Sequence, residues 1–238
     1  TGSDNTAVGD NAGGALTTGA ENVAVGSSAL LTEDGNGKNV AVGFEALKVQ
    51  NAGADGYSTA IGYKALVANT TGINNTAVGG LVMQANTTGT DNTAMGYAAL
   101  DANTTGTDNT AIGDFALSEN TTAAYNTAVG SSALLANTTG ASNVAVGNAA
   151  LDASTTGDDN VAIGSNSMTT NTTASDNTAV GSSSLKLNTT GASNTAVGRT
   201  ALSANTTASN NTAVGFAALL ANTTGANNTA MGKDSLAA

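Results

Sequence analysis

The sequence predicts an all-β fold, a parallel β-solenoid in which one short segment of chain recurs turn after turn. Three observations predict it: a seventeen-residue phrase runs through the 238 residues, glycine and alanine stand at fixed places in every copy, and proline is absent. Self-similarity at a fixed period is the sequence signature of repeat architectures. A proline cannot donate to the hydrogen-bonded ladder between stacked strands, so its absence also favours this fold.

The repeat is counted from the first residue of the motif Asn-Thr-Ala-Val-Gly, which we number position 1. Every step between copies is 17 residues except one of 19, from Asn39 to Ser58. We therefore expect about fourteen turns that form a single repeat domain over residues 1–238, as a segment of a longer fibre. The copies begin at Asn5, Asn22, Asn39, Ser58, Asn75, Asn92, Asn109, Asn126, Asn143, Asn160, Asn177, Asn194, Asn211 and Asn228.

Positions 2 to 4 predict one short strand in each turn. Position 2 is Thr or Val, position 3 is always Ala, position 4 is Val, Ile or Met, and position 5 is always Gly. Alternate residues of a strand point to opposite faces. We therefore expect positions 2 and 4 to fill the core and the alanines to lie against another backbone or sheet. "Ala-Leu" at positions 8 and 9 predicts a second short strand, and Gly at position 5 and the "NTTG" segment predict corners, because Asn and Gly tolerate positive φ.

These columns give the expected core and the expected contact between chains. The core columns are Val8, Val25, Val42, Ile61, Val78, Met95, Ile112, Val129, Val146 and Ile163, together with Leu100, Leu117, Leu134 and Leu151. The contact column is Ala94, Ala111, Ala128 and Ala145. About two substantial side chains per turn are too few to offset the entropy lost in ordering a whole turn. We therefore expect a homo-oligomer that shares a second apolar face.

A leucine-rich-type repeat with a short helix in each turn is the alternative fold. The segments "AALDAN" and "SALLAN" contain good helix formers. Glycine at position 5 and the "NTTG" segment leave only a short uninterrupted stretch between them, so the solenoid is favoured.

Composition excludes several classes of function. Nucleic-acid binding needs clustered basic residues, whereas the chain has six Lys and Arg and a net charge of −11. No apolar run approaches the ~20 residues of a membrane span. Without His or Cys, a Ser or Thr nucleophile has only lysine as a base. We therefore expect no enzyme activity, catalytic residue or cofactor. The candidate bases are Lys38, Lys48, Lys64, Lys186 and Lys233.

Acidic residues recur directly before position 1, and two of them one turn apart, Asp91 and Asp108, suggest a calcium site built of carboxylate and carbonyl oxygens. The competing interpretation is that each side chain caps the adjoining turn and keeps the surface soluble. The Asp-x-Asp-x-Asp-Gly spacing of a calcium loop is missing, so we expect no metal site. The acidic residues are Asp4, Glu21, Asp91, Asp108, Asp159 and Asp176.

The "NTT" segment occurs in nine copies and is formally a glycosylation sequon, although a turn explains it equally well. Ranks of threonine on a flat solenoid also suggest ice binding. Adjacent threonines of a strand point to opposite faces, so only one from each pair joins a given rank. A Thr-x-Thr spacing, which would supply two, occurs at Thr88–Thr90 and Thr105–Thr107 but is absent from most turns.

Aromatic residues are few, and exposed aromatics mark binding surfaces. All seven stand at position 6 or 7 or directly before position 1, which we expect to be the rim of the roll. Tyr57 belongs to the irregular turn "VQNAGADGYS", whose two extra residues should bulge outward, either as a tolerated insertion or as a carbohydrate or receptor contact. The seven are Phe44, Tyr57, Tyr63, Tyr97, Phe115, Tyr125 and Phe216.

The motif resembles a known family. "DNVAIGSNS" at Asp159–Ser167 and "DNTAVGSSS" at Asp176–Ser184 are similar to the "NSVAIGxxS" head repeats of YadA-like trimeric autotransporter adhesins. The whole array is also similar to the "NTAIGYQALYSNTTGYN" repeats of secreted bacterial fibres and phage-type tail fibres. The resemblance implies a left-handed β-roll with positions 2 and 4 pointing into it, and a homotrimer of rolls, intertwined or side by side. Adhesin head turns are usually shorter, so the corner here is longer.

From this resemblance we expect a structural or adhesive shaft or head segment of an extracellular trimeric fibre, on a cell surface or a virion tail. Its partners would be two further copies of the chain and a receptor or glycan bound by a tip outside this segment, with no nucleic acid and no membrane span. The alternative is an ice- or glycan-binding solenoid that uses its Thr- and Asn-rich wall. A fibre-borne polysaccharide depolymerase ranks third.

Overall fold

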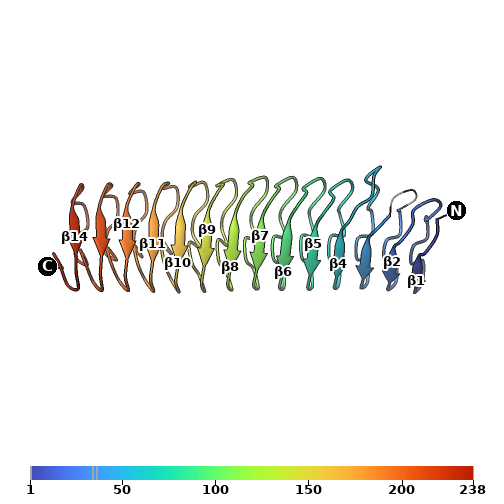
Figure 1. Cartoon of the computed structure of the whole chain (residues 1–238), viewed down its shortest axis with the longest axis horizontal. Coiled ribbons are helices and arrows are strands. Elements are labelled where there is room, and N and C mark those ends of the chain that lie inside the picture. Colours follow the sequence, from blue (N-terminus) through green and yellow to red (C-terminus); the bar gives the residue numbers. More distant parts are fainter. Residues whose placement is uncertain (1, 34, 36, 238) are drawn as a thin grey trace. The chain divides into compact units, whose positions relative to one another are not determined.

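The computed structural model describes residues 2–33, 35 and 37–237 and confirms the predicted fold class, an all-β parallel β-solenoid with turns of about 17 residues. The chain divides into two compact units, Thr1–Ala123 and Ala124–Ala238, and each unit is a run of the same turn (Figure 1). The single domain expected over residues 1–238 stays a prediction.

Each turn contributes one strand of three residues, at positions 2 to 4. The first unit contains β1 (Thr6–Val8), β2 (Val23–Val25), β3 (Val40–Val42), β4 (Thr59–Ile61), β5 (Thr76–Val78), β6 (Thr93–Met95) and β7 (Thr110–Ile112). The second contains β8 (Thr127–Val129), β9 (Val144–Val146), β10 (Val161–Ile163), β11 (Thr178–Val180), β12 (Thr195–Val197), β13 (Thr212–Val214) and β14 (Thr229–Met231).

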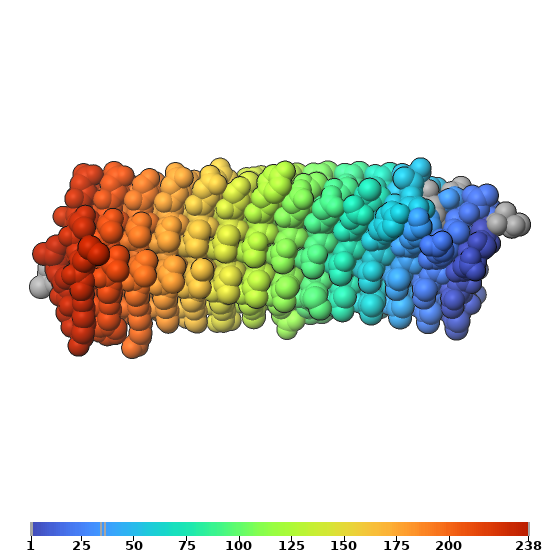
Figure 2. Space-filling model, in the orientation of Figure 1, coloured from blue at the N-terminus to red at the C-terminus, as the bar shows by residue number. Residues whose placement is uncertain are grey.

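Strand pairing is parallel and in register within each unit. In the first unit Ala94 of β6 pairs with Ala111 of β7, and in the second Ala145 of β9 pairs with Ala162 of β10. Equivalent positions of successive turns are thus neighbours, and their side chains form rows from turn to turn within each unit (Figure 2). Each side chain therefore packs against the side chains at the same repeat position in the turns above and below.

The alternation along each strand is the reverse of what we expected. The alanines Ala94, Ala111, Ala128 and Ala145 have no exposed surface, because they point into the roll of their own chain. The prediction that they form a contact between chains is therefore wrong. Leu at position 9 and the asparagines at positions 1 and 12 fill the interior, so only a methyl group fits opposite them.

The residues at position 4 lie on the opposite side of the strand, facing outward. Their prediction as core residues is wrong: Ile112 keeps 38% of its surface and Ile163 keeps 39%, and the others are half-buried or exposed. The corrected set is Val8, Val25, Val42, Ile61, Val78, Met95, Ile112, Val129, Val146 and Ile163. The leucines were predicted correctly, since Leu100, Leu117, Leu134 and Leu151 are fully buried.

The second strand expected at positions 8 and 9 is absent from the described turns, where the chain forms a turn instead. Leu100 has a left-handed backbone with φ of 54°, and Ala98, two residues earlier, has φ of 51°. Such a conformation costs a leucine about 1–2 kcal/mol. It persists because it directs the side chain into the core while the Leu100 N–H still donates to the Ala116 carbonyl of the next turn, at 3.0 Å.

In the turns of β5 to β8, β10 and β12, two asparagine amides meet at one carbonyl, an arrangement we call the asparagine clasp. In the turn of β6, the Gly106 oxygen at position 15 accepts Nδ2–H from Asn92 at position 1 (2.9 Å) and from Asn103 at position 12 (3.1 Å). Each amide also donates to its equivalent one turn earlier, Asn92 to Asn75 Oδ1 (3.2 Å) and Asn103 to Asn86 Oδ1 (2.7 Å). The clasp thus satisfies buried polar groups within a turn and between turns.

Glycine is required at position 5 because the turns approach closely there. In the second unit Gly130 has φ of 131°, a region that side-chain-bearing residues avoid. A Cβ atom at Gly130 would lie 2.6 Å from the carbonyl oxygen of Gly147 in the next turn. Backbone conformation and stacking therefore both explain why this column is glycine in every copy.

We expect Asn188→Ala to destabilise the chain. Asn188 donates to Asn171 Oδ1 (3.1 Å) and to the Gly191 carbonyl (2.8 Å), and accepts from Asn205 Nδ2 (2.9 Å). Its loss leaves buried partners unpaired, at about 1–3 kcal/mol for each unsatisfied group. Urea unfolding measures the effect, with Thr190→Ala, an exposed site in the same turn, as the control. Equal stability of both variants would contradict the role of the asparagine at position 12.

The corrected alternation makes a second prediction for β7. Ala111→Leu should reduce the free energy of unfolding by about 1–3 kcal/mol through overpacking, because the added atoms enter the filled interior. Ile112→Leu, at the neighbouring outward position, should change it by much less. Thermal and urea denaturation of the pair decide this, and an Ala111→Leu variant as stable as the native chain would show that the alanine does not face the interior.

Candidate interaction surfaces

The outer sheet face is the surface made by the side chains at positions 2 and 4. It carries Thr or Val at position 2 and Val, Ile or Met at position 4, half-buried or exposed in each described turn. No charged residue occupies either position in any copy. Each unit therefore has a long uncharged face, rich in β-branched side chains, on the side of the sheet opposite the core.

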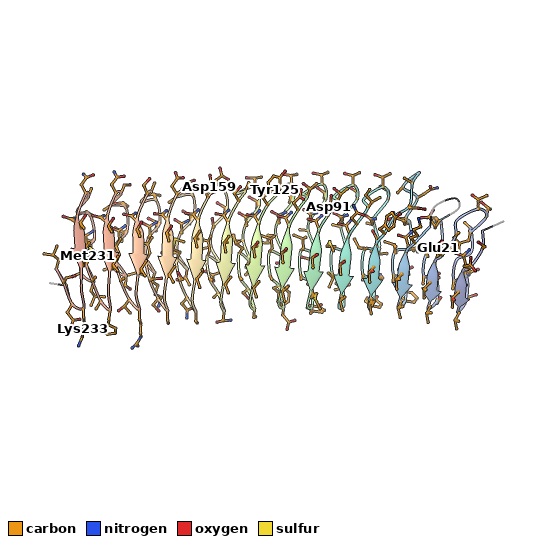
Figure 3. The ribbon with its side chains drawn as sticks, in the orientation of Figure 1. Glu21, Asp91, Tyr125, Asp159, Met231 and Lys233 are labelled. Carbon is orange, nitrogen blue, oxygen red and sulfur yellow. The ribbon has the colours of Figure 1, made fainter. Side chains whose placement is uncertain are left out.

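The acidic residues lie at position 17, at one edge of each unit; Asp91 is labelled at this edge in the first unit, and Tyr125 and Asp159 in the second (Figure 3). This position has a left-handed backbone in every regular turn, with φ of 59° at Asp91 and 56° at Asp159. Asp and Asn tolerate that conformation better than most residues. The backbone is thus a sufficient reason for the column, without a ligand.

The described residues contain no group of three or more His, Cys, Asp or Glu side chains placed to hold a metal. The carboxylates contact their own chain instead. Asp91 Oδ1 accepts from Asn74 Nδ2 at 3.0 Å, and Asp158 Oδ1, at position 16, accepts from the Ala141 N–H at 2.7 Å. These hydrogen bonds tie one turn to the next at the corner, which agrees with the capping interpretation.

Two further carboxylates were not singled out by the sequence. Asp101 and Asp152 both stand at position 10, where burial raises the pKa of each carboxyl, and the neighbouring Glu119 charge further raises that of Asp101. A raised pKa marks candidate acids and bases. Both carboxylates also accept hydrogen bonds from backbone N–H groups of their own and the following residue. Neither is paired with a side chain that could act with it as acid or base.

Four of the five candidate lysine bases lie within ion-pair distance of a carboxylate. Lys38 lies 2.6 Å from Asp55, and this hydrogen bond raises the pKa of the ammonium group. Lys48 and Lys64 both pair with Glu45, at 2.6 and 3.7 Å. A lysine must lose its proton to act as a base, and a carboxylate partner opposes that loss. The geometry of these lysines therefore favours a structural role.

The "NTT" segment forms a bend rather than a strand, so its two threonines do not lie on opposite faces of a sheet. The Asn is buried in the clasp, as at Asn103, so the folded chain hides its amide from a glycosylating enzyme. The first Thr is half-buried except at Thr70 and Thr223, and the Thr104 hydroxyl donates to the Thr121 carbonyl of the next turn at 3.0 Å. The second Thr, at position 14, is exposed. This exposed rank contains Thr71, Thr88, Thr105, Thr122, Thr139, Thr156, Thr173, Thr190, Thr207 and Thr224.

The irregular turn bulges outward as predicted: residues 51–55 are exposed or half-buried, and the loop between β3 and β4 projects beyond its neighbours (Figure 1). Gln50 replaces Asn at position 12 and stays buried, donating from Nε2 to the Gly72 carbonyl at 3.2 Å. Backbone hydrogen bonding between turns resumes directly after the insertion, where the Asn74 N–H donates to the Gly56 carbonyl at 2.8 Å. Tyr57 is exposed, and its hydroxyl lies 3.0 Å from Lys38 Nζ.

Comparison of the chain with known protein families, with curated proteins and with solved structures found no match. Among the described residues there is no helix long and apolar enough to cross a membrane. The surfaces described above are therefore the basis for assigning a function.

We expect removal of divalent metals to leave the fold intact. The acidic corner is explained by backbone conformation and by bonds such as Asn74 to Asp91. A chelator should shift the melting temperature by only a few degrees, measured by circular dichroism, and Asp159→Asn should behave like the native chain. A large loss of stability on chelation, reversed by calcium, would contradict this.

Proposed function

We propose that the chain is a structural or adhesive segment of an extracellular fibre on a cell surface or a virion tail, in which three copies pack through their outer sheet faces. The observation that carries this proposal is the uncovered, uncharged face along each unit. Parallel sheets are normally covered on both faces. Here the core covers one face only, and the side chains at position 4, such as Ile61, Ile112 and Ile163, keep roughly two fifths of their surface exposed.

Charge supports the choice of this face. Each chain has a net charge of −11, so three copies repel one another wherever acidic corners meet. The outer sheet face is free of charged side chains and can approach its equivalent without burying an ion. In a closed threefold assembly each chain contacts the next in the same way, and the repetition of this face lets that contact recur from turn to turn.

The resemblance to adhesin and tail-fibre repeats supports the number of copies and the location outside the cell. The residues "VAIG" at Val161–Gly164 are identical to those of the adhesin repeat, and Asn160 stands where that repeat has Ser. A solenoid whose turns contact only their neighbours grows by adding turns. That property suits a spacer or shaft, whose length matters more than any single residue.

Ice or glycan binding by the wall itself is the second candidate. The observation that favours it is the exposed threonine rank at position 14, together with threonine on the outer sheet face in turns such as those of β11 and β12. A regular array of hydroxyl and methyl groups can order water along a flat surface. This candidate needs the threonines to stay exposed, whereas the fibre proposal covers those at position 2.

Sedimentation tests the fibre proposal. The native chain should be a trimer at micromolar concentration, and Ile112→Glu with Ile163→Glu should yield folded monomers, because charge would enter the contact. Thr122→Glu with Thr173→Glu, at the exposed position 14 of the same two turns, should leave the trimer intact. Circular dichroism verifies folding in each case.

A folded native monomer would overturn the proposed assembly. If that monomer also showed thermal hysteresis in ice, reduced by replacing Thr139 and Thr156 with Lys, the second candidate would be supported. Trimers that persist in the Ile112→Glu, Ile163→Glu variant would place the contact on another face.

A further inference from the structure

Four of the seven aromatic residues gather in the first unit, at positions 6 and 7 of the turns of β3 to β7. We call Phe44, Tyr63, Tyr97 and Phe115 the aromatic strip. Their side chains keep 46%, 52%, 50% and 43% of their surface exposed. Five consecutive turns at about 4.8 Å place the first and last ring roughly 19 Å apart along the unit.

The rings are arranged as two pairs on either side of a glycine. Phe44 and Tyr63 are stacked, with centroids 5.7 Å apart and planes at 11°, and Tyr97 and Phe115 meet edge to face at 5.5 Å. Gly80 occupies position 6 in the turn between the pairs. A Cβ there would lie 3.6 Å from Cδ2 of Tyr97, so the Tyr97 ring lies close to this glycine, where no side chain competes with it.

The fold does not require aromatic residues at this corner. Ser27, Ser131, Ser165 and Ser182 occupy position 6 in turns with the same strand and the same glycine at position 5. None of the four rings is buried in the core. Aromatic side chains that are exposed, clustered and unnecessary for folding mark a binding surface.

Polar groups border the strip. Lys64 Nζ lies 5.4 Å from the Tyr63 ring centroid, and Lys48 and Lys64 share the Glu45 carboxylate. Hydrogen bonding to Lys48, above all, lowers the pKa of Glu45, so its carboxyl is charged at neutral pH. At the other pair, Asp114 Oδ1 accepts the Tyr97 N–H at 3.0 Å. Exposed rings with ammonium donors and carboxylate acceptors beside them combine apolar contact with hydrogen bonding.

We propose that the aromatic strip binds a linear polysaccharide, with the C–H faces of its sugar rings against the aromatic rings and its hydroxyls on the polar border. A repeating polymer matches a strip of repeating turns, because equivalent contacts recur along one direction. Nucleic acid also stacks on aromatic rings, but the net charge of −11 opposes it. Two lysines for one glutamate leave a local positive charge beside Phe44 and Tyr63, which admits acidic as well as neutral sugars.

Affinity electrophoresis of the intact chain in gels containing a soluble β-glucan, a mannan or a polyuronate tests the proposal. We expect at least one of them to retard the chain. Phe44→Ser with Tyr63→Ser should weaken that binding about tenfold, as should Tyr97→Ser with Phe115→Ser, and the fourfold variant should lose it. Salt should weaken binding of the polyuronate but not of the neutral polymers.

Phe216→Ser is the matched control. Phe216 also stands at position 6 and is exposed, but its recorded neighbours are Arg199 and Lys233, at 5.9 Å each, rather than a second ring. It should bind as the native chain does. Circular dichroism and sedimentation of every variant separate loss of the site from loss of fold or assembly, so the result does not depend on the proposed fibre.

The proposal would be overturned if no polysaccharide retards the native chain, or if binding survives the fourfold variant. It would also be overturned if Phe216→Ser weakens binding as much as removal of a ring pair. Retention of the native chain, but not of the strip variants, on a peptide or protein surface, with no response to any sugar polymer, would also overturn it and would point to a different class of ligand.

Discussion

The asparagine clasp is the interaction on which the rest of this structure depends. A solenoid turn with a small core must bury the backbone of its corners, and buried carbonyls need donors. In the turn of β6 the Asn92 and Asn103 amides meet at the Gly106 carbonyl while each continues a ladder to its equivalent one turn earlier. Because the donors are side chains at fixed positions, a shift of one residue would leave these groups unpaired. The clasp therefore explains the period and the recurrence of asparagine at positions 1 and 12.

The same arrangement decides which positions vary. Once asparagine, alanine and leucine fill the interior, the outward positions are free of packing constraints, and they hold the differences between turns. Position 6 is Ser, Asn, Asp, Lys, Arg, Gly, Phe or Tyr, whereas position 3 is always Ala. The aromatic strip and the lysines around Glu45 are built from such variable positions. Recognition is thus separated from stability, and a surface can change without disturbing the core.

Much of the fold follows from the sequence, because its period and its glycine column allow few alternatives. The direction of the side chains did not follow. A period of two assigns positions 2 and 4 to one face and position 3 to the other, but it does not say which face is inside. We assigned the larger residues to the core, whereas the structure places Ala111 inside and Ile112 outside, because Leu117 and the asparagines already fill the space. The buried role of Asn at position 12 was also missed, although its recurrence three residues before the Gly or Ala at position 15 was a signal.

Residue-resolved amide hydrogen exchange tests the clasp most directly, and the second unit offers suitable reporters. The Asn160 N–H donates to the Asn143 side-chain oxygen at 3.0 Å, whereas the Val161 N–H donates within the backbone ladder to the Asn177 carbonyl at 2.8 Å. If the side-chain ladder is as firm as the sheet, both hydrogens exchange at similarly slow rates. If Asn160 exchanges as fast as Ala141, whose N–H donates to Asp158 at the exposed corner, the clasp does not hold the turns together.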